Sequence, residues 1–204
     1  METLQEALYL EKVPPSWKDR AYPSLLGLGP WFSDLLVRIR VLANWTSDFQ
    51  LPTSVWIGGL FNPQSFLTAI MQTTARKSEL PLDKMVLTID ETKRIEDVST
   101  FGYPKNGIFC NGFYMEGARW DSHTNQIVES KIKELSQQMP HWHIKAITIE
   151  QRNENRNSNN FNFYECPVYK TRQRGQTYVW TFNLKTKENP SNWILGGVCL
   201  LLQI

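Results

Sequence analysis

The apolar residues of this chain change their spacing near residue 85, and this change restricts the folds open to it. Before that point they recur every three to four positions, which is typical of helices that bury one face. After it they alternate with polar residues, which is typical of half-buried strands. Short connections without crossover helices favour antiparallel pairing. The order predicts an α+β fold, with N-terminal helices followed by an antiparallel β-barrel of about six strands.

Three helices are indicated in the first 80 residues, which we expect to form a helical subdomain. The first begins near Leu4, the second at Gly29-Pro30 and the third at Asn62-Pro63. Proline favours the first position of a helix, and an asparagine before it accepts a hydrogen bond from a free backbone amide. The stripe expected to be buried on the second helix comprises Phe32, Leu35, Leu36, Ile39, Leu42 and Ala43.

Residues 81–204 are expected to form the barrel subdomain. Turn sequences such as Lys105-Asn106-Gly107 separate its strand-like segments. One further strand is expected between residues 116 and 131, and a short helix over Lys131–Gln138. The six predicted strands are Met85–Asp90, Gly107–Met115, His143–Ile149, Glu165–Lys170, Gln176–Leu184 and Ile194–Leu202.

The Asn-rich stretch Gln151–Asn162 interrupts this pattern. It holds six asparagines in twelve residues and no aliphatic residue. Such a segment cannot bury enough apolar surface to offset the entropy that is lost on ordering. We therefore expect a mobile loop over 151–162.

Composition and charge exclude several classes of protein. Apolar residues make up 41% and charged residues 21% of the sequence, as in globular domains. The formal net charge is only +2, so no dense positive surface for nucleic acid is expected. The longest apolar run, Trp193–Leu202, is half the length of a membrane span and indicates a buried terminal strand. Neither a nucleic acid nor a membrane is therefore expected as a partner.

The N-terminal sequence and the cysteines favour a reducing compartment. The first twelve residues, METLQEALYLEK, lack the basic and then apolar layout of a signal peptide. Cys110, Cys166 and Cys199 are odd in number and lie in apolar, strand-like runs, so no disulfide framework is expected. A cytoplasmic or cytoskeletal location fits this pattern.

No catalytic, cofactor-binding or metal-ligating residue is predicted. Gly107, Gly112 and Gly117 have the spacing of a phosphate-binding loop, but the lysine and hydroxyl residue that must follow are missing. His141 and His143 would face one side of a strand, but no third or fourth ligand has a suitable spacing. A G-x-S-x-G turn for a serine nucleophile is also missing from the sequence.

Charged and aromatic residues outside the predicted core are the candidates for an interaction surface. One set lies in a turn after residue 116, a second in a basic hairpin tip and a third in the N-terminal helical segment. For the two turns, a self-satisfied or merely solvated turn is the alternative. Exposed aromatics are expected in the third set, where Trp31 and Phe32 also lie. The candidates are Arg119, Trp120 and Asp121; Lys170, Arg172 and Arg174; and Trp17 and Tyr22.

Six stretches, taken together, resemble the C-terminal domain of dynein heavy chains, the part that follows the last AAA+ module of the motor ring. They occur in the family's order and cover nearly the whole sequence, although 151–162 departs from the family pattern. EGARWD and ECPVYKT resemble the axonemal branch, and an outer-arm type is the finer expectation within that branch. The stretches are VPPSW (Val13–Trp17), YPSL (Tyr22–Leu25), GGLFNPQSFLTA (Gly58–Ala69), YMEGARWD (Tyr114–Asp121), ECPVYKT (Glu165–Thr171) and WILGGV (Trp193–Val198).

The resemblance implies one C-terminal dynein domain in which helices lead into an antiparallel β-barrel. Such a domain is expected to lie across one face of the AAA+ ring of the same heavy chain and to modulate the motor in a ciliary or flagellar axoneme. ATP and magnesium would bind in the ring, while microtubules and other dynein subunits would be partners of the parent complex. None of the six stretches is an ATP-binding loop, so no ATP hydrolysis by these residues is implied.

Two other classes of function stay open at this point. A stand-alone β-barrel would bind a peptide or a glycan, and a small hydrolase would hold a site without a recognisable motif. Nucleotide binding by the 204 residues themselves would favour an enzyme over the docking domain that the resemblance implies.

Overall fold

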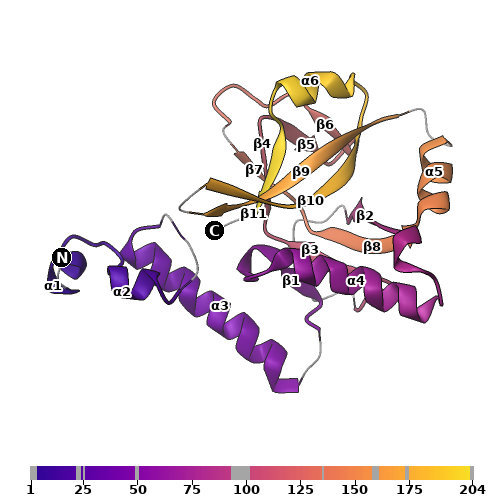
Figure 1. Ribbon diagram of the computed structural model, residues 1–204. Coiled ribbons are helices and arrows are strands. Elements are labelled where there is room, and N and C mark those ends of the chain that lie inside the picture. The colour runs from indigo at the N-terminus through magenta and orange to yellow at the C-terminus, as the bar shows by residue number, and fades with distance from the viewer. Residues whose placement is uncertain are drawn as a thin grey trace. The chain divides into compact units, whose positions relative to one another are not determined.

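A computed structural model describes residues 4–21, 24, 26–48, 51–92, 102–134, 136–157, 161–172 and 175–202 (Figure 1). The protein divides into two compact units. Unit 1 is Met1–Pro52 with Thr171–Thr177 and Ile204, and unit 2 is Thr53–Lys170 with Tyr178–Gln203. The first division therefore falls after Pro52, whereas the sequence places a subdomain boundary at residue 80.

Unit 1 is helical, as the sequence predicts. Its helices are α1 (Leu4–Tyr9), α2 (Pro15–Lys18) and α3 (Leu28–Asp48). Proline stands at the first position of α2, and α3 begins two residues before Pro30. Within the described ranges, no helix of either unit combines the length and the apolar character that a membrane span requires.

The core of unit 1 is small. Val13 and Trp31 are buried against each other, and Ala21 and Leu35 pack on them. The rings of Trp17 and Trp31 are stacked, with their centroids 6.1 Å apart. Trp31 is therefore a core residue and not one of the exposed aromatics that the sequence predicts in this segment.

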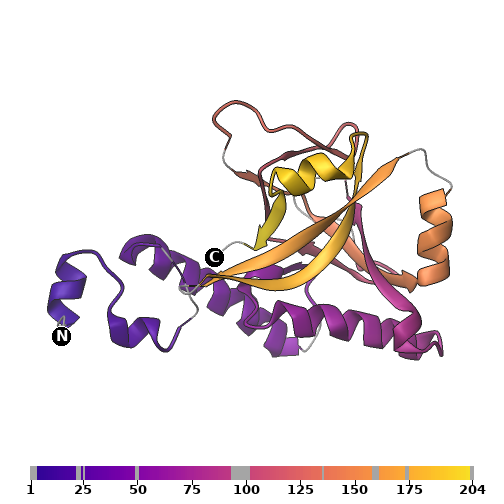
Figure 2. The same ribbon diagram turned by 45° about the horizontal axis from the view of Figure 1, so that its top comes forward.

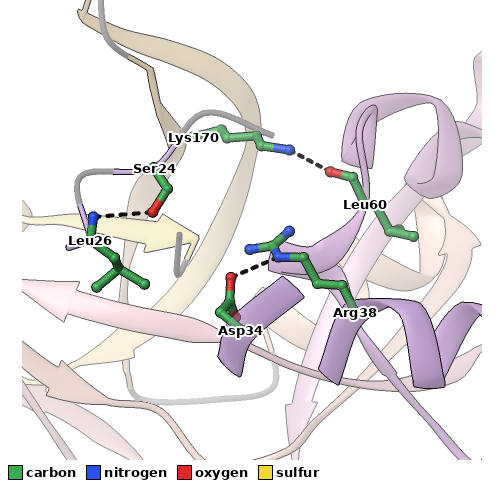
Figure 3. Close-up of polar contacts among 6 residues, drawn as sticks. All are labelled: Ser24, Leu26, Asp34, Arg38, Leu60 and Lys170. Carbon is green, nitrogen blue, oxygen red and sulfur yellow. Dashed lines mark hydrogen bonds and ion pairs between the residues drawn. The ribbon is translucent and has the colours of Figure 1, made fainter. Parts of the chain in front are cut away.

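The buried face of α3 is not the predicted apolar stripe. The helix buries Trp31 and also Arg38, whose guanidinium is paired with Asp34 one turn earlier at 2.9 Å (Figure 3). Most of the predicted stripe is exposed instead: Phe32, Leu36, Ile39, Leu42 and Ala43. The 3.6-residue period is right, but it marks a face that this unit leaves uncovered.

Unit 2 combines short helices with strands, so the α+β prediction is confirmed. The asparagine cap of α4 is as predicted, since Asn62 Oδ1 accepts the backbone amide of Ser65 at 3.0 Å. The elements are β1 (Ser54–Trp56), a 3₁₀ turn (Ile57–Gly59), α4 (Pro63–Lys77), a 3₁₀ turn (Leu82–Lys84), β2 (Met85–Glu91), β3 (Ile108–Asn111), β4 (Phe113–Glu116), β5 (Arg119–Asp121), β6 (Gln126–Val128), β7 (Ser136–Gln138), β8 (Trp142–Thr148), α5 (Ile149–Asn157), β9 (Asn162–Arg172), β10 (Gly175–Thr186), α6 (Pro190–Leu195) and β11 (Cys199–Leu202).

The strands of unit 2 form open sheets, so the predicted closed antiparallel barrel is wrong. One sheet has the order β1-β3-β8-β2, a second has the order β10-β9-β11-β4-β7, and β5 pairs with β6. The pairs β1–β3 and β9–β11 are parallel. The backbone leaves β9 through β10 and α6 before it returns as β11, and this detour places two parallel strands side by side (Figure 2).

A glycine connects the two larger sheets. The strand predicted over Gly107–Met115 is interrupted at Gly112, which has a φ of +93°. Residues before it form β3 in the four-stranded sheet, and residues after it form β4 in the five-stranded sheet. A Cβ at this position would lie 2.5 Å from the Trp56 ring, so a side chain would not fit there.

Four aromatic rings form a cluster within the core of unit 2. Phe113 of β4 stacks on Trp142 of β8 with ring centroids 5.3 Å apart. Phe182 of β10 approaches Phe113 edge to face at 6.2 Å, and Trp120 of β5 approaches Trp142 at 5.9 Å. Each of these rings comes from a different strand, so the cluster holds all three sheets together.

The helix predicted over Lys131–Gln138 is wrong in the part that the structure describes, because Ser136–Gln138 is strand β7 beside β4. The Gln137 side chain accepts the backbone amide of Trp120 at 2.7 Å and donates to the Trp120 carbonyl at 3.3 Å. These two hydrogen bonds connect β7 to β5 and fix the segment in an extended form.

The strand predicted over Ile194–Leu202 is correct only in its second half. Asn189 accepts the backbone amide of Ser191 at 3.0 Å, and Pro190 occupies the first position of α6. This Asn-Pro pair begins a helix in the same way as Asn62-Pro63 does. Ile194 and Leu195 are therefore exposed helical residues and not part of a strand.

The loop predicted over 151–162 is helical from Gln151 to Asn157, and residues 158–160 lie outside the described ranges. The backbone amide of Thr148 donates to Gln151 Oε1 at 3.1 Å, and the amide of Gln151 donates to Thr148 Oγ1 at 3.2 Å. This reciprocal capping box satisfies two free amides and starts α5 without any buried apolar residue from the Asn-rich stretch.

We expect Gly107→Ala to destabilise unit 2 strongly. Gly107 has a φ of +74°, and a Cβ there would lie 2.1 Å from the carbonyl oxygen of Ile144 in β8. The left-handed backbone alone costs about 1–2 kcal/mol for alanine, and separating β3 from β8 brings the expected loss to at least about 3 kcal/mol. Urea unfolding monitored by circular dichroism measures this loss.

Gly197→Ala is the matched control, because Gly197 has a φ of +64° but no atom within 4 Å of the added Cβ. This variant should lose only the backbone contribution of about 1–2 kcal/mol. Equal losses in the two variants would show that the close approach of β3 to β8 is not a constraint.

Candidate interaction surface

The turn around Trp120 is part of the core and does not present that indole to a partner. Trp120 lies in β5 and is 6% exposed, with its ring edge against Trp142. Its backbone is held by Gln137 on both sides. The sequence analysis names Trp120 as a contact residue on a surface. This prediction is wrong, because the side chain belongs to the core.

Asp121 stabilises the same turn from within. Its carboxylate accepts the Thr124 hydroxyl at 2.7 Å and the His123 backbone amide at 3.2 Å. These two hydrogen bonds lower the pKa of Asp121 below its ordinary value. Arg119 is half-buried in the same strand. The carboxylate of Asp121 is thus hydrogen-bonded within the turn itself. This is the self-satisfied turn that the sequence analysis left open as an alternative.

Lys170 is a buried structural lysine, not the start of a solvated hairpin tip. Its side chain is 5% exposed, and its ammonium donates to the carbonyl of Leu60 and to that of Phe61 at 3.5 Å (Figure 3). It thereby connects β9 to the loop that leads into α4, although the two segments are 110 residues apart. The side chain of Arg172, and Arg174 as a whole, lie outside the described residues.

The exposed apolar residues of unit 1 form the most extensive candidate surface. Trp17 and Phe32 are 38% and 50% exposed, as expected from the sequence, while Tyr22 lies outside the described residues. Among the described residues of this unit, the buried apolar residues are only Ala7, Val13, Pro14 and Trp31. We call the exposed set the unit 1 apolar surface; it comprises Leu4, Leu8, Tyr9, Leu10, Trp17, Leu26, Phe32, Leu36, Val37, Ile39, Leu42 and Leu51.

The histidine pair is not arranged around a common point. The imidazole of His141 lies 2.9 Å from the hydroxyl of Ser54, whereas that of His143 lies 2.6 Å from the carbonyl of Asn106. Over the part of the sequence that the structure describes, no group of three or more His, Cys, Asp or Glu is placed to hold a metal ion.

The three cysteines are buried and unpaired, and each has its place in a sheet. Burial raises the pKa of Cys110, of Cys166 and of Cys199, because a thiolate loses its hydration there. Buried thiols in this state are poor nucleophiles. Their role in the described structure is packing.

We expect Lys170→Met to lower the free energy of unfolding by about 1–3 kcal/mol, because the carbonyls of Leu60 and Phe61 lose their charged donor. Lys187→Met is the control, since Lys187 is exposed, and it should change stability by less than about 0.5 kcal/mol. Thermal unfolding of both variants tests this. Equal stability of the two would show that the buried ammonium is dispensable.

We also expect Asp121 to make stability depend on acid pH. Its folded-state pKa lies below the unfolded value of 3.8, so the carboxylate stabilises the fold above that pH, and this contribution is lost as pH falls through the folded-state pKa. Asp121→Asn should therefore flatten the dependence of unfolding free energy on pH below about 4. Denaturant unfolding at several acid pH values measures this; an unchanged slope in the variant would contradict it.

Comparison with known proteins places these features in one family. A family model described as the C-terminal domain of the dynein heavy chain matches residues 1–202. The sequence is 56% identical to "Dynein beta chain, ciliary" of Heliocidaris crassispina, 55% to "Dynein axonemal heavy chain 17" of Homo sapiens and 42% to "Dynein beta chain, flagellar outer arm" of Chlamydomonas reinhardtii. Each match covers 100% of the 204 residues and 4% of the relative, so this protein spans a small fraction of those relatives.

Proposed function

Since this protein belongs to the family formed by the C-terminal domains of dynein heavy chains, we propose that it docks on the AAA+ motor ring of its own heavy chain and modulates ATP-driven movement along microtubules. Its relatives are named as ciliary, axonemal and flagellar dyneins, which supports a place in an axoneme. Microtubules and other dynein subunits are then partners of the parent complex.

The unit 1 apolar surface is the observation that carries the proposal. Four of its members follow one stripe of α3, namely Phe32, Leu36, Ile39 and Leu42, while Val37 lies on another side of that helix. Large exposed apolar areas on a soluble protein mark sites of contact with another protein. A ring module that covers this helix would supply the burial that unit 1 lacks.

In this proposal the domain is not an enzyme. ATP and magnesium act in the ring of the parent heavy chain, and no catalytic cofactor belongs to these residues. The burial of the three thiols and the separate hydrogen bonds of His141 and His143 support this assignment. The contribution of the domain is mechanical: docking favours some arrangements of the ring modules over others.

The size of this effect follows from the docking energy that differs between ring states. A domain that binds more tightly to one arrangement of the ring shifts the equilibrium between arrangements by that difference in docking free energy. A difference of about 1–3 kcal/mol changes the ratio of the two populations about 5- to 150-fold. One or two well-buried aliphatic side chains supply such a difference. Movement is therefore tuned while the nucleotide site keeps its own chemistry.

The test replaces the apolar stripe of α3 in the complete heavy chain. Leu36 and Ile39 are 47% and 53% exposed and lie three residues apart on one face, so Leu36→Gln with Ile39→Gln should leave the fold intact. We expect an altered microtubule gliding velocity and an altered ATPase rate, because about 1–3 kcal/mol of docking energy is lost. ATP binding by the ring should be retained.

Val37→Gln is the matched control. Val37 is 49% exposed but points about 100° away from Leu36 around the helix, so this change removes similar apolar area from another side. It should affect gliding less than the stripe variant does. Wild-type gliding and ATPase in the stripe variant, or loss of ATP binding by the ring, would contradict the docking role.

A further inference from the structure

Unit 2 contains a cavity of about 410 Å³, which lies within the size range of small-ligand sites. Strands β2, β8 and β10 supply most of its wall, and α5 supplies one side. The aromatic rings of Trp120, Trp142 and Phe163 also line it. Figures 1 and 2 both show α5 beside the ends of β8 and β9.

Positive charge dominates the lining. The described lining residues include four cationic side chains, Lys145, Arg152, Arg156 and Lys185, and a single acidic one, Asp90. Asp90 is paired with Lys145 at 2.5 Å. Arg152 and Arg156 are four residues apart on α5, where like charges repel and weaken a helix. A bound anion would relieve this repulsion.

Hydrogen-bond donors without an acceptor are concentrated on the same lining. Among the described residues, Nε of Arg152, Nε of Arg156 and the indole nitrogens of Trp120 and Trp142 are buried and have no hydrogen-bond partner. All four residues line the cavity. Folded proteins rarely leave buried N–H groups without an acceptor. Each of these four groups is a hydrogen-bond donor, so together they suit a ligand that is rich in acceptors.

One arginine of α5, Arg156, is partly fixed in position. Arg156 donates to Asn183 Oδ1, lies 3.5 Å from a carboxylate oxygen of Glu165 and stands 5.6 Å from the centre of the Phe163 ring. The capping box at Thr148 and Gln151 holds the start of the helix. The guanidinium groups thus stand on an ordered helix, and planar guanidinium forks bind phosphate and carboxylate groups in two-point contacts.

We propose that this cavity binds a small polyanion that carries phosphate or carboxylate groups. The ligand places its oxygen acceptors among Arg152, Arg156 and Lys185 and neutralises the cationic face of α5. The site is independent of docking by unit 1, because every residue that lines it belongs to unit 2.

Isothermal titration of the 204-residue protein with pyrophosphate and with citrate tests the proposal. The first probe represents phosphate ligands and the second represents polycarboxylates. At least one should bind at a single site with a dissociation constant below about 1 mM at low ionic strength, and more weakly as salt is added. The preferred probe tells the two sources apart.

Two variants change the affinity in opposite directions. Arg152→Gln with Lys185→Gln removes two cations and should weaken binding about tenfold or more. Asp90→Asn removes the acidic lining residue and frees Lys145, so it should tighten binding by about threefold or more. A gain in affinity cannot come from a variant that has failed to fold.

Arg76→Gln with Lys77→Gln is the control, because it removes the same charge from the last turn of α4, away from the cavity lining. Its affinity should stay within about twofold of wild type. Failure of both probes to bind, or equal losses of affinity in the two double variants, would each overturn the proposal. None of these results would bear on gliding, so failure here is distinct from failure of the docking role.

Discussion

The ring cluster around Trp142 is the contact on which the rest of unit 2 depends. Trp142 is 1% exposed and contacts the rings of both Phe113 and Trp120, and Phe113 in turn contacts Phe182. Open sheets do not close on themselves, so side chains must hold them together. The cluster fixes β8 against β4 and β10 and holds the β5–β6 hairpin. Two of these rings, Trp120 and Trp142, also border the cationic cavity, whose wall comes partly from strands that the cluster joins.

The sequence predicts those elements whose signals are local. Asn62-Pro63 begins α4 as expected, and the alternating pattern locates both ends of β2 and of β8 to within one residue. The closed barrel fails because strand order is set by contacts that are distant in sequence, such as the parallel pairing of β9 with β11. The errors at α5 and α6 have another cause. The capping box at Thr148 and the cap at Asn189 are both visible in the sequence, and both indicate the start of a helix. The low apolar content of the Asn-rich stretch nevertheless favours a loop at the first place, and the apolar run from Trp193 favours a strand at the second.

For the candidate interaction surface, too, contacts that are distant in sequence decide which side chains are buried and which are exposed. Residue type suggests contact for Trp120 and Lys170, but both are buried, because each lies in a strand at a position whose side chain faces the core. Conversely, Leu36 and Ile39 carry the pattern of a buried stripe, but they are exposed. The spacing of apolar residues identifies the apolar face of a helix, but it does not show which molecule covers that face. The cavity was beyond prediction, because its lining comes from strands and a helix that are up to about a hundred residues apart.

The unequal burial of the two units bears directly on how such a domain acts. Unit 2 has its own aromatic core and a buried ammonium at Lys170, so its internal geometry is strongly determined. Unit 1 buries Val13 and Trp31 but leaves most of α3 without a cover. A short helical segment with so small a core gains most of its stability from packing on a partner. If unit 1 docks as proposed above, its conformation and its docking form one equilibrium. Under the same proposal, a ring that rearranges during a working cycle changes the burial of α3, and this change links the state of the ring to the conformation of the domain.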